Sequence, residues 1–330
     1  MIKQNIRFAG AVLLSISGFL TAILANLLVR QVADVKINSY TMFGRTVDIN
    51  EAYRFVLFVL IVLYAGLCVY AFFRKDSRVK YLKRAPFRLA CGIALTVWDI
   101  IGTKYLLLPQ PFFPGPARII EPFLMEPDFI FENTLYSLRL FVIGFGIGVF
   151  AGVATGILIG WFPKVYYWVY PVLKITGVIP AVAWMPFALT LFPTPFAGAV
   201  FLIVICAWFP VASLTAQGIQ STPKVQFEVM RTLGAKTPYL VFCVAIPHAM
   251  PSIFTGIGTA NAFAFTTLVL AEMMGQPGGL GYYINVSKVW SAYYKVFAAI
   301  LVMAVMFSII MEIIGLIQRY VLRWQRGLLR

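Results

Sequence analysis

Apolar stretches of about twenty residues recur along the chain and alternate with short polar segments. A helix needs about 20 apolar residues to cross the hydrocarbon core of a bilayer, so each stretch predicts a membrane-spanning helix. The eight stretches lie approximately at residues 8–29, 55–73, 89–108, 134–160, 166–191, 196–216, 249–275 and 296–316. The pattern predicts an all-α polytopic membrane protein with about eight transmembrane helices.

The composition supports a membrane protein and excludes other classes. Of the 330 residues, 61% are hydrophobic and 12% are charged, and the mean hydropathy is +0.87. Soluble domains carry about twice that charged fraction. The aromatic residues lie within the apolar stretches rather than among the basic residues, so we expect the lipid bilayer and no nucleic acid as a partner. The four cysteines form no C-x-x-C motif and the chain has one histidine, so we expect no metal.

The basic residues predict how the chain is oriented. The net charge is +15, from 27 Lys and Arg against 12 Asp and Glu. In an eight-span arrangement, 17 of the basic residues fall on one side of the membrane and 7 on the other. Because Lys and Arg are enriched in short cytoplasmic loops, both termini are predicted to be cytoplasmic. The positive charge is then explained by topology and gives no argument for an anionic substrate.

Residues 1–88 are expected to form a two-helix membrane extension that ends in a basic loop, and residues 89–330 a six-helix core. The segment 109–133 contains six prolines, which predicts a stiff extended segment on the outer side. Within the fourth stretch, glycine recurs at every fourth position, at Gly144, Gly148, Gly152, Gly156 and Gly160. Such a stripe predicts that another helix backbone approaches closely, and it indicates packing rather than chemistry.

Polar residues within the seventh stretch have two interpretations. Helical spacing places one group on a common face and a second group on roughly the opposite face. The first group is Ser252, Thr255, Gly256, Thr259 and Thr266, and the second is Asn261 and Glu272. Polar groups within a bilayer are costly unless they face a partner or water. They are therefore either interhelical hydrogen-bonding groups or the lining of a translocation path.

The loop 217–247 is predicted to hold two short helices. The first runs from Pro223 to Leu233, with Thr222 as its N-cap, and ends at Gly234. The second runs from Lys236 to Ile246 and is broken at Pro247. Two short helices at a membrane surface form a docking site rather than a catalytic pocket.

This loop resembles the Glu-Ala-Ala signature of permease subunits of bacterial binding-protein-dependent ATP-binding-cassette importers. The residues that match its register are Glu228, Gly234, Val244, Ile246 and Pro247. Val229 and Met230 stand where the signature has two alanines, which changes the detail of the fit to an ATPase. The resemblance implies that the loop couples the chain to that ATPase. The residues expected to do so are Glu228, Arg231, Thr232, Leu233, Gly234, Ala235 and Pro247.

The resemblance extends over residues 98–324 and is to the nitrate, sulfonate, taurine and bicarbonate branch of these permeases. The motifs that carry it include Leu108-Pro109, Trp208-Phe209-Pro210, Ala271 to Gly275 and Gly279 to Tyr282. It implies a homodimer in the bacterial inner membrane, two ATPase subunits that hold ATP and magnesium, and a separate extracytoplasmic substrate-binding protein. It also implies a small oxyanion or organic acid as cargo, while the identity of that cargo stays open.

The residues add candidates for the translocation path. These are Ser252, Thr255, Thr259, Asn261, Thr266, Lys174 and Glu272. Lys174 and Arg139 lie in or near predicted spans, where a cation either marks a path or extends to the headgroups.

Two other classes of function have less support in the sequence than the importer permease. The sequence has no Gly-x-x-x-x-Gly-Lys-Ser/Thr loop, so we expect the ATPase on another polypeptide and no cofactor on this chain. An ion-coupled secondary transporter or channel is the alternative, but Asp99 and Glu272 are the only candidate intramembrane carboxylates. A membrane enzyme would need clustered His, Asp or Glu residues, whereas the chain has a single histidine, His248.

Overall fold

The computed structural model describes residues 2–32, 39–42, 45–73 and 75–324. Within these ranges, seven helices are long and apolar enough to cross a membrane, or eight if one bent pair is a single span. Each predicted stretch overlaps one of these helices or the bent pair, which confirms the predicted fold class. The strands of the described part form one antiparallel hairpin, β1 (Ser39–Met42) with β2 (Arg45–Asp48).

The chain divides into two compact units. The first contains residues 1–130 and 287–298, and the second residues 131–286 and 299–330. The expected boundary at residue 88 lies within a helix of the first unit, and the division into extension and core stays a prediction.

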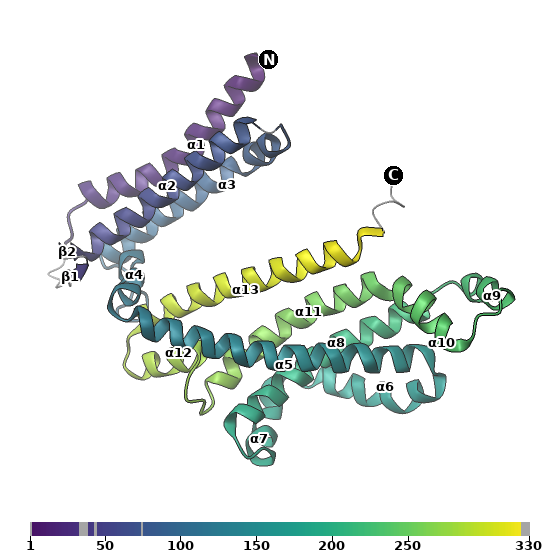
Figure 1. The fold of residues 1–330 in the computed structure, drawn as a ribbon. Coiled ribbons are helices and arrows are strands. Elements are labelled where there is room, and N and C mark those ends of the chain that lie inside the picture. Colours follow the sequence, from purple (N-terminus) through teal and green to yellow (C-terminus); the bar gives the residue numbers. More distant parts are fainter. Residues whose placement is uncertain (1, 33–38, 43–44, 74, 325–330) are drawn as a thin grey trace. The chain divides into compact units, whose positions relative to one another are not determined.

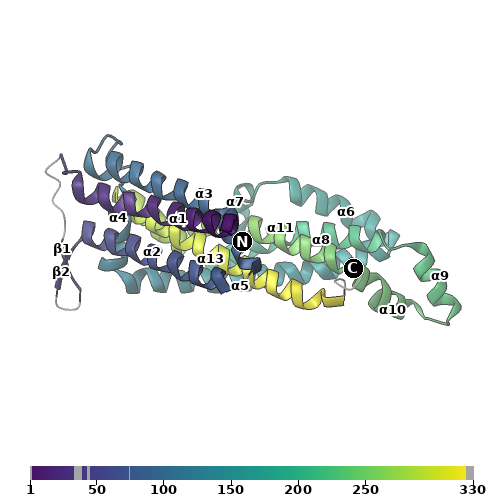
Figure 2. The same ribbon diagram turned by 90° about the horizontal axis from the view of Figure 1, so that it is seen from above.

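The first unit is built on three long helices, which lie side by side (Figures 1 and 2). They are α1 (Ile2–Leu28), α2 (Ile49–Phe73) and α3 (Lys75–Asp99), followed by a π-helical turn η1 (Ile100–Lys104) and by α4 (Pro116–Met125). At Gly18 and Gly92 the backbones of α1 and α3 touch, because a Cβ added at Gly92 would collide with the backbone of Gly18. The bundle is therefore closed by backbone contact.

Polar groups within this unit find partners between its helices. Asn26 Nδ2 donates to Asp99 Oδ2 at 2.8 Å and to Asn50 Oδ1 at 3.4 Å. The guanidinium of Arg88 lies 4.1 Å from the ring centroid of Tyr81. Contacts of this kind let a membrane bundle hold a buried carboxyl and a buried cation.

The prediction of an extended segment over residues 109–133 is wrong. Helix α4 begins at Pro116 and α5 (Pro127–Trp161) begins at Pro127. A proline at the first helical position lacks an N–H that would have no intrahelical partner there, so it starts a helix instead of preventing one.

The second unit contains the remaining helices, with α8 packed against α6, α7 and α11. They are α6 (Pro163–Val178), α7 (Ala181–Leu191), α8 (Pro195–Gln220), α9 (Lys224–Thr232), α10 (Thr237–Leu240), a π-helical turn η2 (Val241–Ala245), α11 (Ile246–Glu272), α12 (Leu280–Val289) and α13 (Tyr293–Val321). Helix α5 also belongs to the second unit from Phe131 onward, whereas the last residues of α12 and the first of α13 belong to the first unit.

The fifth predicted span, residues 166–191, is not one straight helix. It is divided at Ile179 and Pro180 into α6 and α7, which meet at 106°. Proline cannot continue the hydrogen-bond ladder, and it disfavours helical backbone at the preceding residue. Ile179 accordingly has ψ 119°.

The glycine stripe packs against α8, as predicted. A Cβ added at Gly148 would lie 2.7 Å from the Cβ of Ala207, and one added at Gly152 would lie 2.7 Å from the Cβ of Val211. The residues of α8 that meet the stripe also recur at every fourth position, at Ile203, Ala207, Val211, Thr215 and Ile219. Gly146 lies off this face, with nothing within 4 Å of an added Cβ.

We expect Gly152→Ala to destabilise the protein by about 1–3 kcal/mol, because the added methyl overpacks the contact with α8. The matched control is Gly146→Ala on the same helix. It should be neutral or slightly stabilising, since alanine is the better helix former. Thermal unfolding in detergent micelles compares the two variants, and equal midpoints would contradict the close packing.

Candidate functional site

A short surface helix, α9, forms the predicted first helix of the loop. It begins at Lys224, and the predicted N-cap role of Thr222 is wrong, because Pro223 occupies that position and no side chain caps the helix. Gly234 ends α9 as predicted, with φ +80°, a conformation that favours glycine. The amide of Ala235 donates to the carbonyl of Met230 at 3.0 Å, which closes the turn.

The predicted break at Pro247 is also wrong. Helix α10 continues through η2 into α11, so Thr237–Glu272 is one 36-residue span. The amide of Ile246 donates to the carbonyl of Val241 in the π-helical turn. Pro247 directly follows this π-helical turn, where the hydrogen-bond register shifts by one residue, so its missing N–H does not end the helix.

The face of α9 that points away from the rest of the unit is apolar and exposed. Val225, Val229 and Leu233 recur at four-residue spacing and are 65%, 52% and 75% exposed. On the inner face, Phe227 contacts Trp161 of α5, with 5.4 Å between their ring centroids. The helix is therefore anchored on one side and presents an apolar stripe on the other, which is typical of a protein-docking surface.

The predicted coupling residues gather around this helix with one exception. Glu228, Arg231, Thr232, Leu233, Gly234 and Ala235 lie on α9 and in the turn that follows it, and Pro247 lies at the start of α11. Glu228 and Arg231 are exposed. We call the exposed residues Val225, Glu228, Val229, Arg231 and Leu233 the α9 surface.

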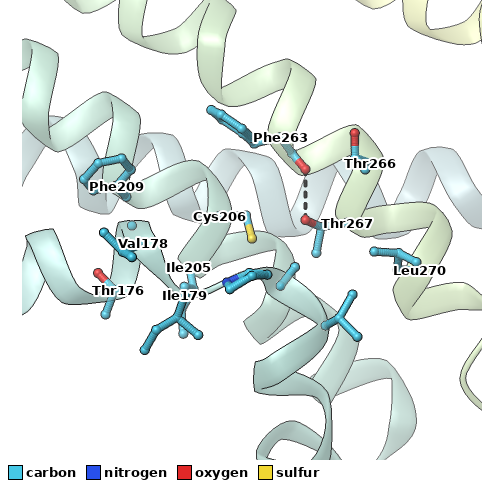
Figure 3. Close-up of a pocket in the computed structure, with 14 residues that line it drawn as sticks. Thr176, Val178, Ile179, Ile205, Cys206, Phe209, Phe263, Thr266, Thr267 and Leu270 are labelled. Carbon is cyan, nitrogen blue, oxygen red and sulfur yellow. Dashed lines mark hydrogen bonds between the residues drawn. The ribbon is translucent and has the colours of Figure 1, made fainter.

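A cavity of about 390 Å³ lies at the bend between α6 and α7 (Figure 3). Residues of α6, α7, α8 and α11 line it. Its polar side chains are the hydroxyls of Thr176, Thr266 and Thr267 and the thiol of Cys206, and the described lining includes no charged side chain. The Thr267 hydroxyl donates to the carbonyl of Phe263 at 2.9 Å. The lining is apolar with a few hydroxyl groups.

The bend between α6 and α7 explains why a cavity lies at this place. The first N–H groups of a helix have no intrahelical acceptor, and Ala181 and Val182 at the start of α7 line the cavity. At membrane depth, irregular backbone is tolerated only where it is buried in protein or lines a water-filled space. A cavity at a broken span is therefore a candidate for a solute path.

The structure separates the predicted polar face of α11. Thr255, Thr259 and Thr266 are all exposed and donate to the carbonyls four residues earlier, but only Thr266 of the three lines the cavity. Ser252 and Gly256 instead face α8. These residues share one helical face of α11, as predicted, but α8 covers the part of the face that carries Ser252 and Gly256.

The other predicted path residues lie away from the cavity. Asn261 and Glu272, on roughly the opposite face of α11, are fully buried. Glu272 Oε2 accepts from the amide of Gly281 at 2.8 Å. Lys174 is exposed on α6, and Arg139 is exposed with its guanidinium 5.6 Å from the ring centroid of Phe196. The structure does not bring these two cations together with the cavity.

Sequence reasoning missed most of the cavity lining, including Thr176, Cys206 and Thr267. No charge or periodic pattern marks these residues. The available signal was Pro180 within an apolar stretch, three residues after Gly177, because this pair predicts a break and a close approach.

A bundle of membrane spans with a broken helix, a small cavity and an exposed amphipathic helix at one end defines a membrane transport subunit. Residues 144–327 match the family of binding-protein-dependent transport system inner membrane components. This match covers more than half of the chain, so the chain belongs to that family.

Three relatives agree with the branch that the sequence resembles. The nitrate import permease protein NrtB of Synechococcus elongatus is 29% identical over 235 aligned positions, and the match covers 67% of this chain and 81% of that protein. The putative aliphatic sulfonates transport permease protein SsuC of Bacillus subtilis is 29% identical over 72% of this chain and 86% of that protein. The taurine transport system permease protein TauC of Escherichia coli is 27% identical over 71% and 87%.

Proposed function

We propose that two copies of this chain form the transmembrane path of an ATP-driven importer. Separate ATPase subunits bind ATP and magnesium, and an extracytoplasmic binding protein delivers the solute. The observation that carries this proposal is the α9 surface, an exposed apolar stripe on a short helix held at one end of the bundle. Family membership supports the same assignment.

The orientation of the chain follows from this assignment. The α9 surface must face the cytoplasm to meet an ATPase, and the same side of the membrane receives the larger group of basic residues. Both termini are then cytoplasmic, and the turn after α11 lies on the outer side. Arg74, Arg326 and Arg330, which belong to that group, lie outside the described residues.

Reporter fusions test the orientation. A fusion after Arg84 should be active only as a cytoplasmic reporter, and a fusion near Asp48 only as an exported one. The basic residues around Arg84 resist translocation, which is the physical reason for this pattern. The reverse activities would contradict the proposed topology.

Association with the ATPase tests the α9 surface. We expect Val229→Asp to reduce co-purification of the ATPase subunit at least tenfold, because a carboxylate would be desolvated within an apolar contact. The matched control is Gln226→Asp, which adds the same charge at an exposed position of α9 and should cost less than threefold. Transport without any associated ATPase would instead favour the secondary transporter or channel.

For the solute we propose a small oxyanion or organic acid of the nitrate, sulfonate, carboxylate or bicarbonate kind. Support comes from the named cargo of the relatives, which includes nitrate, aliphatic sulfonates and taurine. The hydroxyls of Thr176, Thr266 and Thr267 each donate to a carbonyl of their own helix, and rotation about χ1 would turn a hydroxyl from that carbonyl to an oxyanion. No fixed charge among the described lining residues would trap the anion. Lys174 and Arg139 stay candidates for a part of the path formed between two copies.

Uptake of labelled nitrate, taurine, bicarbonate and an aromatic carboxylate by the reconstituted importer with its own binding protein tests the cargo. We expect uptake of one of these anions and a reduction of three- to tenfold in Thr266→Val, which removes a hydroxyl from the cavity. Thr190→Val is the matched control. Thr190 is exposed on α7, and its hydroxyl, like that of Thr266, donates to the carbonyl four residues earlier in its own helix.

Exclusive transport of a cation, a sugar or a peptide would reject the anion class. Unchanged uptake in Lys174→Gln and Arg139→Gln would remove those two residues from the path.

A further inference from the structure

One continuous rod joins the two ends of the second unit. We give this name to residues 237–272, which comprise α10, η2 and α11 and form one span of 36 residues. At 1.5 Å per residue its path along the helix axis is about 54 Å, and this path contains the π-helical turn and Pro251. The turn at Gly234 and the α9 surface precede one end of the rod (Figure 1), and Glu272 is the last residue at the other end.

Glu272 takes part in an unusual cap at the start of α12. Three successive amides each donate to a side chain from elsewhere in the unit: Gly279 to Asn133 Oδ1 at 2.9 Å, Leu280 to Ser137 Oγ at 2.8 Å and Gly281 to Glu272 Oε2 at 2.8 Å. The first amides of a helix have no intrahelical acceptor, and a carboxylate is favoured at that end. Asn133 and Ser137 belong to α5, so the cap connects α5, α12 and the rod.

The turn between the rod and α12 is closed tightly around this carboxylate. Gly279 has φ +111°, and a Cβ added there would lie 2.5 Å from Glu272 Cδ. At Gly281 an added Cβ would lie 2.6 Å from the carbonyl oxygen of Val269. Glu272 and Asn133 are 0% and 4% exposed. The Tyr136 hydroxyl also donates to Gln276 Oε1 at 2.8 Å, which ties the turn to α5 a second time.

We propose that Glu272 is a positioning residue that latches the outer turn, residues 273–281, to the end of the rod. This inference rests on the proposed function. Movement imposed on the α9 surface by the ATPase is carried along the rod to its other end. Through the hydrogen bonds of the cap, that movement reaches α5 and α12 on the outer side of the membrane. If residues 273–281 were not held by these bonds, the turn would flex and the movement would not reach them.

The test uses the full chain in complex with its ATPase and binding protein in proteoliposomes. For Glu272→Ala we expect basal ATP hydrolysis within twofold of wild type, together with at least a tenfold loss of uptake and of stimulation by the loaded binding protein. Glu272→Gln keeps an acceptor oxygen for the Gly281 amide and should recover at least half of the uptake. The matched control is Glu132→Ala, which removes an exposed carboxylate beside Asn133 and should behave as wild type.

Amide hydrogen exchange of the permease alone in nanodiscs gives a readout that does not depend on transport. In Glu272→Ala the amides of residues 279–281 should exchange at least tenfold faster, while those of α5 opposite α8 keep their rates. Unchanged exchange at residues 279–281, or wild-type uptake by Glu272→Ala, would overturn the latch. A parallel fall of basal hydrolysis and uptake would also overturn it, since a merely structural role predicts that pattern.

If Glu272→Ala does not assemble with the ATPase, Glu272→Asp is used to test the proposal instead. It keeps a carboxyl group but shortens the side chain by one methylene, so it should assemble and lose uptake, whereas wild-type uptake would overturn the proposal. Failure of the wild-type chain to associate with an ATPase counts against the proposed function, and the exchange experiment then still tests the contact.

Discussion

The close contact between α5 and α8 is the constraint on which the second unit depends. Lipid tails are as apolar as leucine, so helices in a bilayer associate through close packing and hydrogen bonds rather than through burial of apolar surface. Each glycine of the stripe receives a side chain of α8 that would collide with a Cβ, as Gly156 does with Thr215. One face of α8 is held in this way, and its other faces pack against two further helices. Helix α11 contacts α8 at Gly218 of α8 and through its own Gly256, and α7 contacts α8 at Gly198.

The position of the cavity follows from the same packing. Ala207 of α8 faces Gly148, and the residue before it, Cys206, lies about 100° around the helix axis from Ala207. Cys206 therefore points away from α5 and lines the cavity at the bend between α6 and α7, as does Phe209. Gly177 permits that bend to approach α8, because a Cβ there would collide with the ring of Phe209. A rigid helix pair thus supplies one wall of a space whose opposite wall is a broken span.

Local patterns in the sequence predicted the parts of the structure that depend on local spacing. The spans follow from the length of apolar stretches, and the glycine stripe follows from helical periodicity. The cap of α12 could not be predicted, because Asn133 and Gly279 are 146 residues apart in the chain. The continuation of the rod past Pro247 was missed for a different reason. A π-helical turn shifts the hydrogen bonds by one residue, and proline alone does not reveal that the shift occurs.

The contacts at the ends of α5 suggest which part of the unit moves. Helix α5 has 35 residues and the rod has 36. Near one end of this pair Trp161 of α5 holds Phe227 of α9, and near the other end Asn133 of α5 holds the turn that follows the rod. Helix α5 and the rod are therefore connected near both ends, so a displacement of α9 acts on both helices. Both arms of the bend between α6 and α7 pack against α8, so a change in the cavity would fall on the irregular backbone at Ile179 and Pro180, where the fewest helical hydrogen bonds have to break.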